Sequence, residues 1–241
     1  MELPLKAVAA LFVLAATWVV SRVQQRPLDV YGIPPRQAFG WRFWEGVAWG
    51  FAMLSLLLSP LWLMGHFHVD SVSLKGGALL AYGLGWALVF LCVSVNEELT
   101  FRGYLLFTAA RRAGFRRAAI YLSLGFGIAH LFNPGETLIG ILQVVGTGLL
   151  FCFMIRRTGN LWFALGFHAS WDWAQTFFYG TPDSGLKSIG YFLNTSIQGP
   201  AWLTGGATGP EGSIFSLAIL ALCALLIHLR FPTAIYPDRP A

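Results

Sequence analysis

Charged side chains are scarce in this chain of 241 residues. Only 11% of the residues are Asp, Glu, Lys or Arg, whereas a soluble domain usually carries about 25%. Together with a hydrophobic content of 56%, this shortage excludes an ordinary soluble domain and indicates an integral membrane protein. The net charge of +5 comes without a basic stripe interleaved with exposed aromatics, so nucleic acid is not an expected partner.

Cysteine and several familiar patterns are also missing. The three cysteines, Cys92, Cys152 and Cys223, are widely spaced inside apolar segments, which excludes a disulfide framework and a CxxC metal site. No HExxH motif and no internal repeat occurs. Strand-like alternation at barrel spacing is absent too, so the expected membrane structure is helical rather than a β-barrel.

What the chain does have is a series of long apolar segments. Each can cross a hydrocarbon core of about 30 Å. They predict an all-α fold: a polytopic membrane helix bundle of about seven transmembrane helices, forming a single domain over residues 1–241. An eighth membrane segment has room within 181–211. The seven segments run approximately over 3–22, 42–65, 77–108, 117–133, 137–156, 160–179 and 212–231.

The positive charges predict an orientation. Twelve of the 16 lysines and arginines fall in alternate connections and in the C-terminal tail, while Lys6, Lys75 and Lys187 fall on the opposite side. The positive-inside rule then places the N-terminus outside and the C-terminus in the cytoplasm. The lipid bilayer is the expected surrounding, and the plasma membrane the expected location.

Ionisable side chains nevertheless interrupt three apolar segments, within the helices of approximately 77–180. Such groups cost a few kcal/mol each and usually face a bundle interior or a wet cavity. The ionisable side chains that could act in catalysis lie 11 to 15 residues from the arginines that flank their segments. At 1.5 Å per helical residue, this places them about 16–23 Å from the arginine-rich ends. Because these side chains are expected at the same depth in the membrane, they are predicted to form a single site. The residues at this depth are Glu97, His130, His168 and Asp172, and Glu98 and Arg102 lie beside Glu97 in the same segment.

Helical spacing indicates which of these side chains share a helix face and can pair. Glu98 and Arg102 are four residues apart and can pair on one face, while Glu97 is rotated by about 100° from Glu98 and points elsewhere. His168 and Asp172 also share a face. A buried Glu–Arg pair is often only structural, and a lone membrane histidine often only bonds a neighbouring helix, but the whole constellation favours a functional site.

Three motifs resemble those of a known family, the CAAX prenyl endopeptidase and bacteriocin-processing (Abi, or CPBP) family of intramembrane proteases. EELTFR, from Glu97 to Arg102, is similar to its EExxxR motif. FGIAH, from Phe126 to His130, is similar to FxxxH, and HASWD, from His168 to Asp172, to Hxxx[N/D]. The motifs occur in the family's order, and the resemblance covers about residues 85–180.

The resemblance implies an endopeptidase whose substrate is a membrane-embedded or membrane-associated protein or peptide. It implies Glu97 as general base, His130 as its partner, and His168 with position 172 as the oxyanion site, supported by Glu98, Arg102 and Phe126. Position 172 departs from the asparagine of the prenyl-protein endopeptidases. An ionised aspartate would repel an oxyanion, so Asp172 is either protonated, or orients His168, or binds a metal.

Alternatives stay open at this stage. No cofactor is expected, but a zinc-dependent protease would use Glu97, His130, His168 and Asp172 as ligands. A non-catalytic immunity or binding protein is a second class. A proton-coupled carrier is a third, although inverted repeats and broken helices in both halves, typical of carriers, are not apparent.

Overall fold

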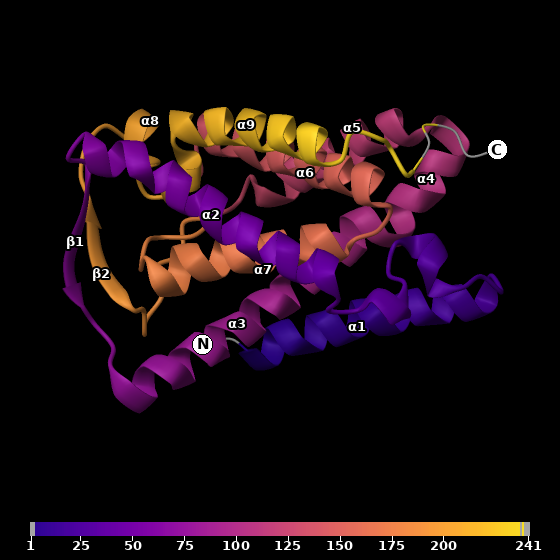
Figure 1. The fold of residues 1–241 in the computed structure, drawn as a ribbon, viewed down its shortest axis with the longest axis horizontal. Helices are drawn as coiled ribbons and strands as arrows, with labels where there is room; N and C mark the ends of the chain where they lie inside the picture. Colours follow the sequence, from indigo (N-terminus) through magenta and orange to yellow (C-terminus); the bar gives the residue numbers. More distant parts are fainter. Residues whose placement is uncertain (1–2, 237, 239–241) are drawn as a thin grey trace.

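The computed structural model describes residues 3–236 and 238. It is mainly helical, and most of its long helices run along one long axis (Figure 1), which confirms the predicted all-α class. One short antiparallel ribbon joins β1 (Phe67–Val72) to β2 (Leu193–Ile197) at one end. The helices are α1 (Leu3–Val23), α2 (Trp41–Leu63), α3 (Gly76–Glu98), α4 (Leu105–Ala113), α5 (Phe115–His130), α6 (Leu138–Thr158), α7 (Trp162–Trp173), α8 (Ala201–Thr204) and α9 (Ile214–Arg230).

Each of the seven predicted apolar segments coincides with a helix. Four stretches are long and apolar enough to cross a membrane by themselves: 3–23, 41–63, 76–113 and 138–158. Helices α5, α7 and α9 have 16, 12 and 17 residues, so the total of seven or eight crossings stays a prediction. The segment 181–211 contains β2, the single turn α8 and irregular chain rather than an eighth membrane-length helix.

The predicted third segment is not one straight helix. Helix α3 continues into a π-helical stretch, Leu99–Tyr104, with a non-helical kink at Gly103, before α4 begins. A π-turn inserts an extra residue into the helical register and is often found at functional sites. Here the register changes within the EELTFR motif itself, between its two glutamates and its arginine.

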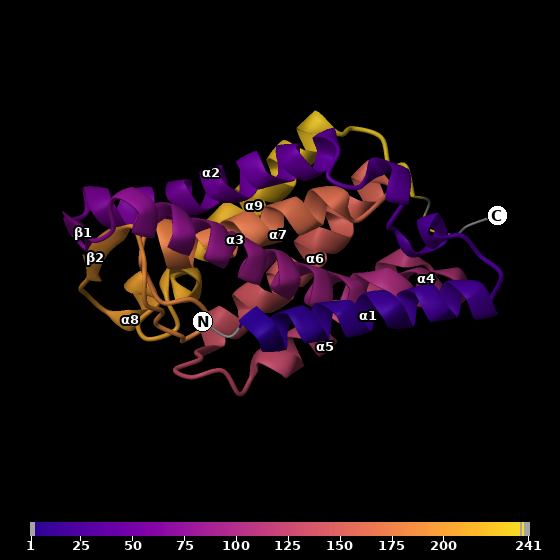
Figure 2. The same ribbon diagram turned by 90° about the horizontal axis from the view of Figure 1, so that it is seen from below.

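Helix α7 is the central helix of the bundle. Its residues from Phe163 to Trp171 are all buried, as expected for a helix that is apolar all round and surrounded by others. Figures 1 and 2 show it running between α2 and α6, with α3 alongside. This position explains why two ionisable side chains of α7 can lie inside the protein.

Glycines bring α2 and α7 into backbone contact. A Cβ added at Gly46 would lie 2.1 Å from the carbonyl oxygen of Phe163, and one at Gly166 would lie 2.1 Å from that of Phe43. Small residues permit this close approach between membrane helices. The reciprocal contact fixes α7 against α2 and thereby fixes the depth at which its motif residues lie.

Candidate active site

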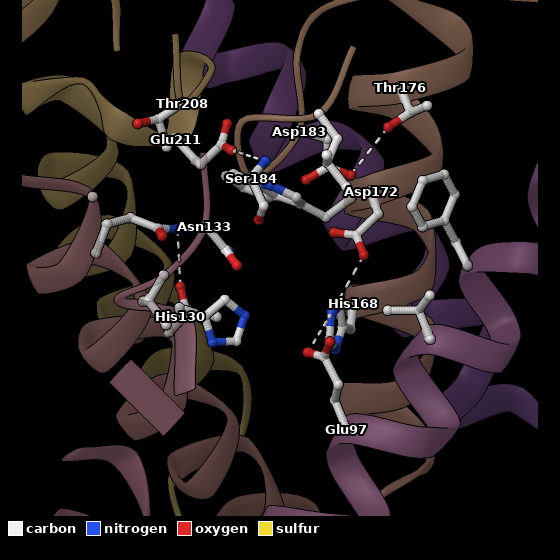
Figure 3. Close-up of a pocket in the computed structure, with 18 of the residues that line it drawn as sticks. Glu97, His130, Asn133, His168, Asp172, Thr176, Asp183, Ser184, Thr208 and Glu211 are labelled. Atoms are coloured by element: carbon white, nitrogen blue, oxygen red, sulfur yellow. Dashed lines mark hydrogen bonds and ion pairs between the residues drawn. The ribbon is translucent and has the colours of Figure 1, made fainter. Parts of the chain in front are cut away.

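A cavity of about 490 Å³ opens between α3, α5, α6 and α7 and is shown in Figure 3. One wall is apolar and comes from α3, with Trp86, Val89, Phe90 and Val93. The cavity is further lined by all four side chains for which the sequence predicts catalytic roles. These are Glu97, His130, His168 and Asp172.

The adjacent glutamates of α3 face different surroundings. Glu97 lines the cavity with 27% of its side chain exposed, whereas Glu98 is fully buried. The rotation of about 100° between neighbouring helical residues produces this separation. One carboxylate is therefore available to a substrate or water, and the other is enclosed by protein.

Glu98 joins the first motif to the third. Its Oε1 accepts a hydrogen bond from Arg102 Nη1 at 3.1 Å and lies 3.0 Å from His168 Nδ1. The guanidinium and the enclosed carboxylate offset each other's charge where no water can solvate them. The second glutamate thus anchors the histidine of α7 as well as pairing with arginine.

Aromatic rings surround the buried arginine. The Arg102 guanidinium carbon lies 4.1 Å from the centre of the Phe126 ring, and 5.7 Å from those of Phe101 and Phe151. Such cation–π contacts stabilise a cation that is removed from water. Gly148 leaves space for the guanidinium, because a Cβ at this position would lie 2.8 Å from Arg102 Nη2. The phenylalanine of FGIAH therefore supports the arginine of EELTFR.

Both ring nitrogens of His168 face carboxylates. While Nδ1 faces Glu98, Nε2 lies 3.3 Å from Asp172 Oδ2 and 3.8 Å from Glu97 Oε2. An imidazole can donate to acceptors on both sides only as the imidazolium. This geometry favours the imidazolium, which would be a fixed positive group beside the half-buried carboxylate of Glu97.

His130 lies on the opposite wall, on α5. Its Nδ1 is 2.8 Å from the carbonyl oxygen of Phe126, and a carbonyl oxygen can only accept, so Nδ1 carries the proton. In the neutral ring, Nε2 then has a free lone pair. Figure 3 shows His130 and Glu97 across the cavity from each other. The two could therefore bind a water or a substrate group between them.

Besides Glu136, to which the sequence assigns no role, the cavity is lined by two acidic residues from the stretch after α7 that sequence reasoning missed. Thr176 Oγ1 donates to Asp183 Oδ2 at 3.0 Å, and the Ser184 backbone N–H donates to Glu211 Oε1 at 2.6 Å. Gln175 donates to the other Glu211 oxygen. Burial raises the pKa of Glu211 to about 8, and burial with the nearby Asp172 charge raises the pKa of Asp183 well above its usual value.

No local pattern identifies these two residues in the sequence. Asp183 and Glu211 lie in the loop-rich stretch after α7, about which helical periodicity says nothing. The loop folds back over α7, and this long-range packing alone brings them to the cavity. Each holds the loop through hydrogen bonds, so their first role is to position it.

The zinc alternative can be compared with the donor set. Among residues 3–236 and 238, no three His, Cys, Asp or Glu side chains gather closely enough to hold a metal ion. The His168 nitrogens face carboxylates at hydrogen-bonding distances instead. The side chains as arranged do not fit tetrahedral zinc, and metal dependence stays an untested prediction.

Comparison with known proteins agrees with the motifs. Residues 80–174 match the model of the Rce1-like family, described as type II CAAX prenyl endopeptidase Rce1-like. The family resemblance is confirmed. The match to this Rce1-like protease family runs from α3 to the end of α7 and contains all three motifs, so it supports a peptidase at the level of the family. No curated protein and no solved structure matches the chain.

Proposed function

We propose that this protein is an intramembrane endopeptidase that hydrolyses peptide bonds of a membrane-associated protein or peptide. The observation that carries the proposal is the position of Glu97, a half-buried carboxylate that faces His130 across a cavity inside a bundle of apolar helices. The Rce1-like match over the same helices supports this class of reaction. The apolar wall from α3 would accept apolar side chains of a substrate.

In this mechanism Glu97 is the general base. It takes a proton from a water while the water oxygen bonds to the carbonyl carbon of the scissile peptide, and His130 Nε2 helps to orient that water. Negative charge moves onto the carbonyl oxygen. When the carbon–nitrogen bond breaks, the proton held by Glu97 passes to the leaving amine, so that protons balance over the cycle.

The other motif residues act through His168. Glu98 and Asp172 hold the ring from its two sides, and the imidazolium stabilises negative charge that develops near Glu97. Asp172 then has an orienting role, which an aspartate can perform as well as an asparagine. Arg102 and Phe126 keep Glu98 in place.

The same proposal includes topology. The arginine-rich connections support a plasma-membrane protein with its N-terminus outside and its C-terminus in the cytoplasm. The substrate would reach the cavity at membrane depth, from lipid. A leader peptide or another membrane peptide fits these requirements, with or without a prenyl group.

The decisive comparison is of membrane peptidomes. Cells that make the wild-type protein are compared with cells that make Glu97→Gln, which keeps the shape of the side chain but removes the base. Glu45→Gln is the matched control, because Glu45 pairs with Arg42 and Arg230 outside the cavity. Peptides cut in wild-type and Glu45→Gln cells, and uncut in Glu97→Gln cells, support the protease. Identical peptidomes in all three would favour the binding or immunity alternative.

A further inference from the structure

Peptide hydrolysis requires a hydrogen-bond donor for the carbonyl oxygen, which becomes negatively charged when water adds to the carbon. In the prenyl-protein endopeptidases that the third motif resembles, this motif ends in an asparagine, but in this chain it ends in Asp172. Its Oδ2 lies 3.3 Å from His168 Nε2, at ion-pair distance. An ionised carboxylate cannot donate, so position 172 supplies no hydrogen-bond donor for the carbonyl oxygen beside the charge of His168.

Most neutral donors that line the cavity already have an acceptor. Gln143 Nε2 donates to Thr147 Oγ1 at 3.0 Å, and Trp171 Nε1 donates to Gln175 Oε1 at 3.1 Å. The remaining donors with protein acceptors are Trp86, which donates to the Ile189 carbonyl, Thr176, which donates to Asp183, and Thr208, which donates to the Gly135 carbonyl.

Asn133 is different. Its side chain lines the cavity and has no hydrogen-bond partner among residues 3–236 and 238. Its backbone N–H donates to the His130 carbonyl oxygen at 3.0 Å, which holds the residue one turn beyond His130. Pro134 follows and restricts the Asn133 backbone to extended conformations. Figure 3 shows Asn133 beside His130, across the cavity from Glu97 and His168.

The other free donors suit the role less well. The Thr147, Ser184 and Ser188 hydroxyls also line the cavity and donate to no acceptor within residues 3–236 and 238, but each offers a single O–H that can rotate, whereas an amide offers two N–H groups in a fixed plane. Lys187 is exposed, and Lys6 lies in the first turn of α1. Both are full charges on long flexible stems, whereas oxyanion stabilisation depends on donors that are fixed before the reaction. An amide has two N–H donors and remains neutral at any working pH.

We propose that the side-chain amide of Asn133 is the oxyanion donor of this enzyme, replacing the amide that is missing at position 172. The inference rests on the proposed protease function and deepens it. As the water oxygen bonds to the carbonyl carbon, the π electrons move onto the carbonyl oxygen, which accepts from Asn133 Nδ2. When the carbon–nitrogen bond breaks, the carbonyl re-forms and the hydrogen bond weakens again.

The test uses purified full-length variants and membranes from cells that make only the Glu97→Gln protein, as the source of uncut substrate. Wild type, Asn133→Ala, Asn133→Asp and Glu97→Gln are added in H₂¹⁸O, and ¹⁸O-labelled new C-termini are counted over time. Asn194→Ala, in β2 and outside the cavity, is the matched control. The amount of membrane is varied to separate the maximal rate from the apparent KM, and a melting curve of each variant verifies folding.

Losing one oxyanion donor costs about 100- to 1000-fold in rate. The expected result is a fall of that size in the maximal rate for both Asn133 variants, with the apparent KM and the melting temperature close to wild type and Asn194→Ala unaffected. Asn133→Asp has the same shape, so it reports on the lost donor even if Asn133→Ala fails to fold.

Two other results are distinguishable. If wild type labels termini and either folded Asn133 variant keeps more than about a tenth of its rate, the oxyanion role is overturned while the protease function stands. If wild type labels no more termini than Glu97→Gln does, the protease function itself is overturned, and the role of Asn133 with it.

Discussion

Substituting Glu98 tests whether the buried ion pair holds the site together. Glu98 and Arg102 have no exposed side-chain surface, and their contact is 3.1 Å. Glu98→Gln removes one charge and leaves a buried guanidinium uncompensated, which costs about 3–5 kcal/mol. In a chain of this length about 1 kcal/mol shifts the unfolding midpoint by 2–4 °C. The midpoint of the purified protein, followed by tryptophan fluorescence, should therefore fall by roughly 6–20 °C.

A double variant and a control sharpen this experiment. Glu98→Gln combined with Arg102→Met removes both charges and should recover most of the lost stability, since an apolar replacement of a buried pair is often neutral. Activity should stay low, because His168 Nδ1 has lost its carboxylate. Glu45→Gln breaks an ion pair with partners 35% and 52% exposed and should cost less than about 1 kcal/mol. If Glu98→Gln is no more destabilising than Glu45→Gln, the reasoning about the buried pair is refuted.

Three further predictions concern packing, pH and metal. Gly148→Ala should lower activity and thermal stability, because its methyl group would lie 2.8 Å from Arg102 Nη2. Gly125→Ala is the control and should leave both unchanged, because the nearest atom to its methyl group is 3.9 Å away. Equal effects of the two substitutions would contradict the account. Since burial raises the pKa of Glu211 from 4.5 to about 8, its contribution to stability is complete below about pH 4.5 and is lost as the pH rises through 8. Glu211→Gln should flatten this decline in a series of melting curves, and an unchanged slope would contradict it. Activity should survive a strong chelator, and a loss that zinc restores would establish the metal alternative.

The sequence was sufficient for the fold class and for the grouping of the four candidate side chains around one cavity. Long apolar segments predict helices because an unsatisfied backbone is too costly in lipid, and each predicted segment is helical, the third with a kink at Gly103. Spacing of four residues predicts the contact between Glu98 and Arg102, because such residues are neighbours on a helix surface. These features depend on local periodicity alone.

Other features depend on packing between distant segments, which periodicity does not describe. The π-turn at Leu99–Tyr104 has no distinct sequence pattern, and neither does the link from Glu98 to His168, 70 residues away. The contact of Phe126 with Arg102 needs the crossing of α5 over the π-turn. Asp183 and Glu211 reach the cavity only because an irregular loop folds back onto α7.

The central claim is that Glu97 activates a water that attacks a peptide bond. Its most direct test is mass spectrometry of the products formed by the purified protein in H₂¹⁸O, with membranes containing uncut substrate. The account predicts new C-termini carrying one ¹⁸O atom with wild type and with Glu45→Gln, and none above background with Glu97→Gln. Labelled termini formed by Glu97→Gln at the wild-type rate would contradict it.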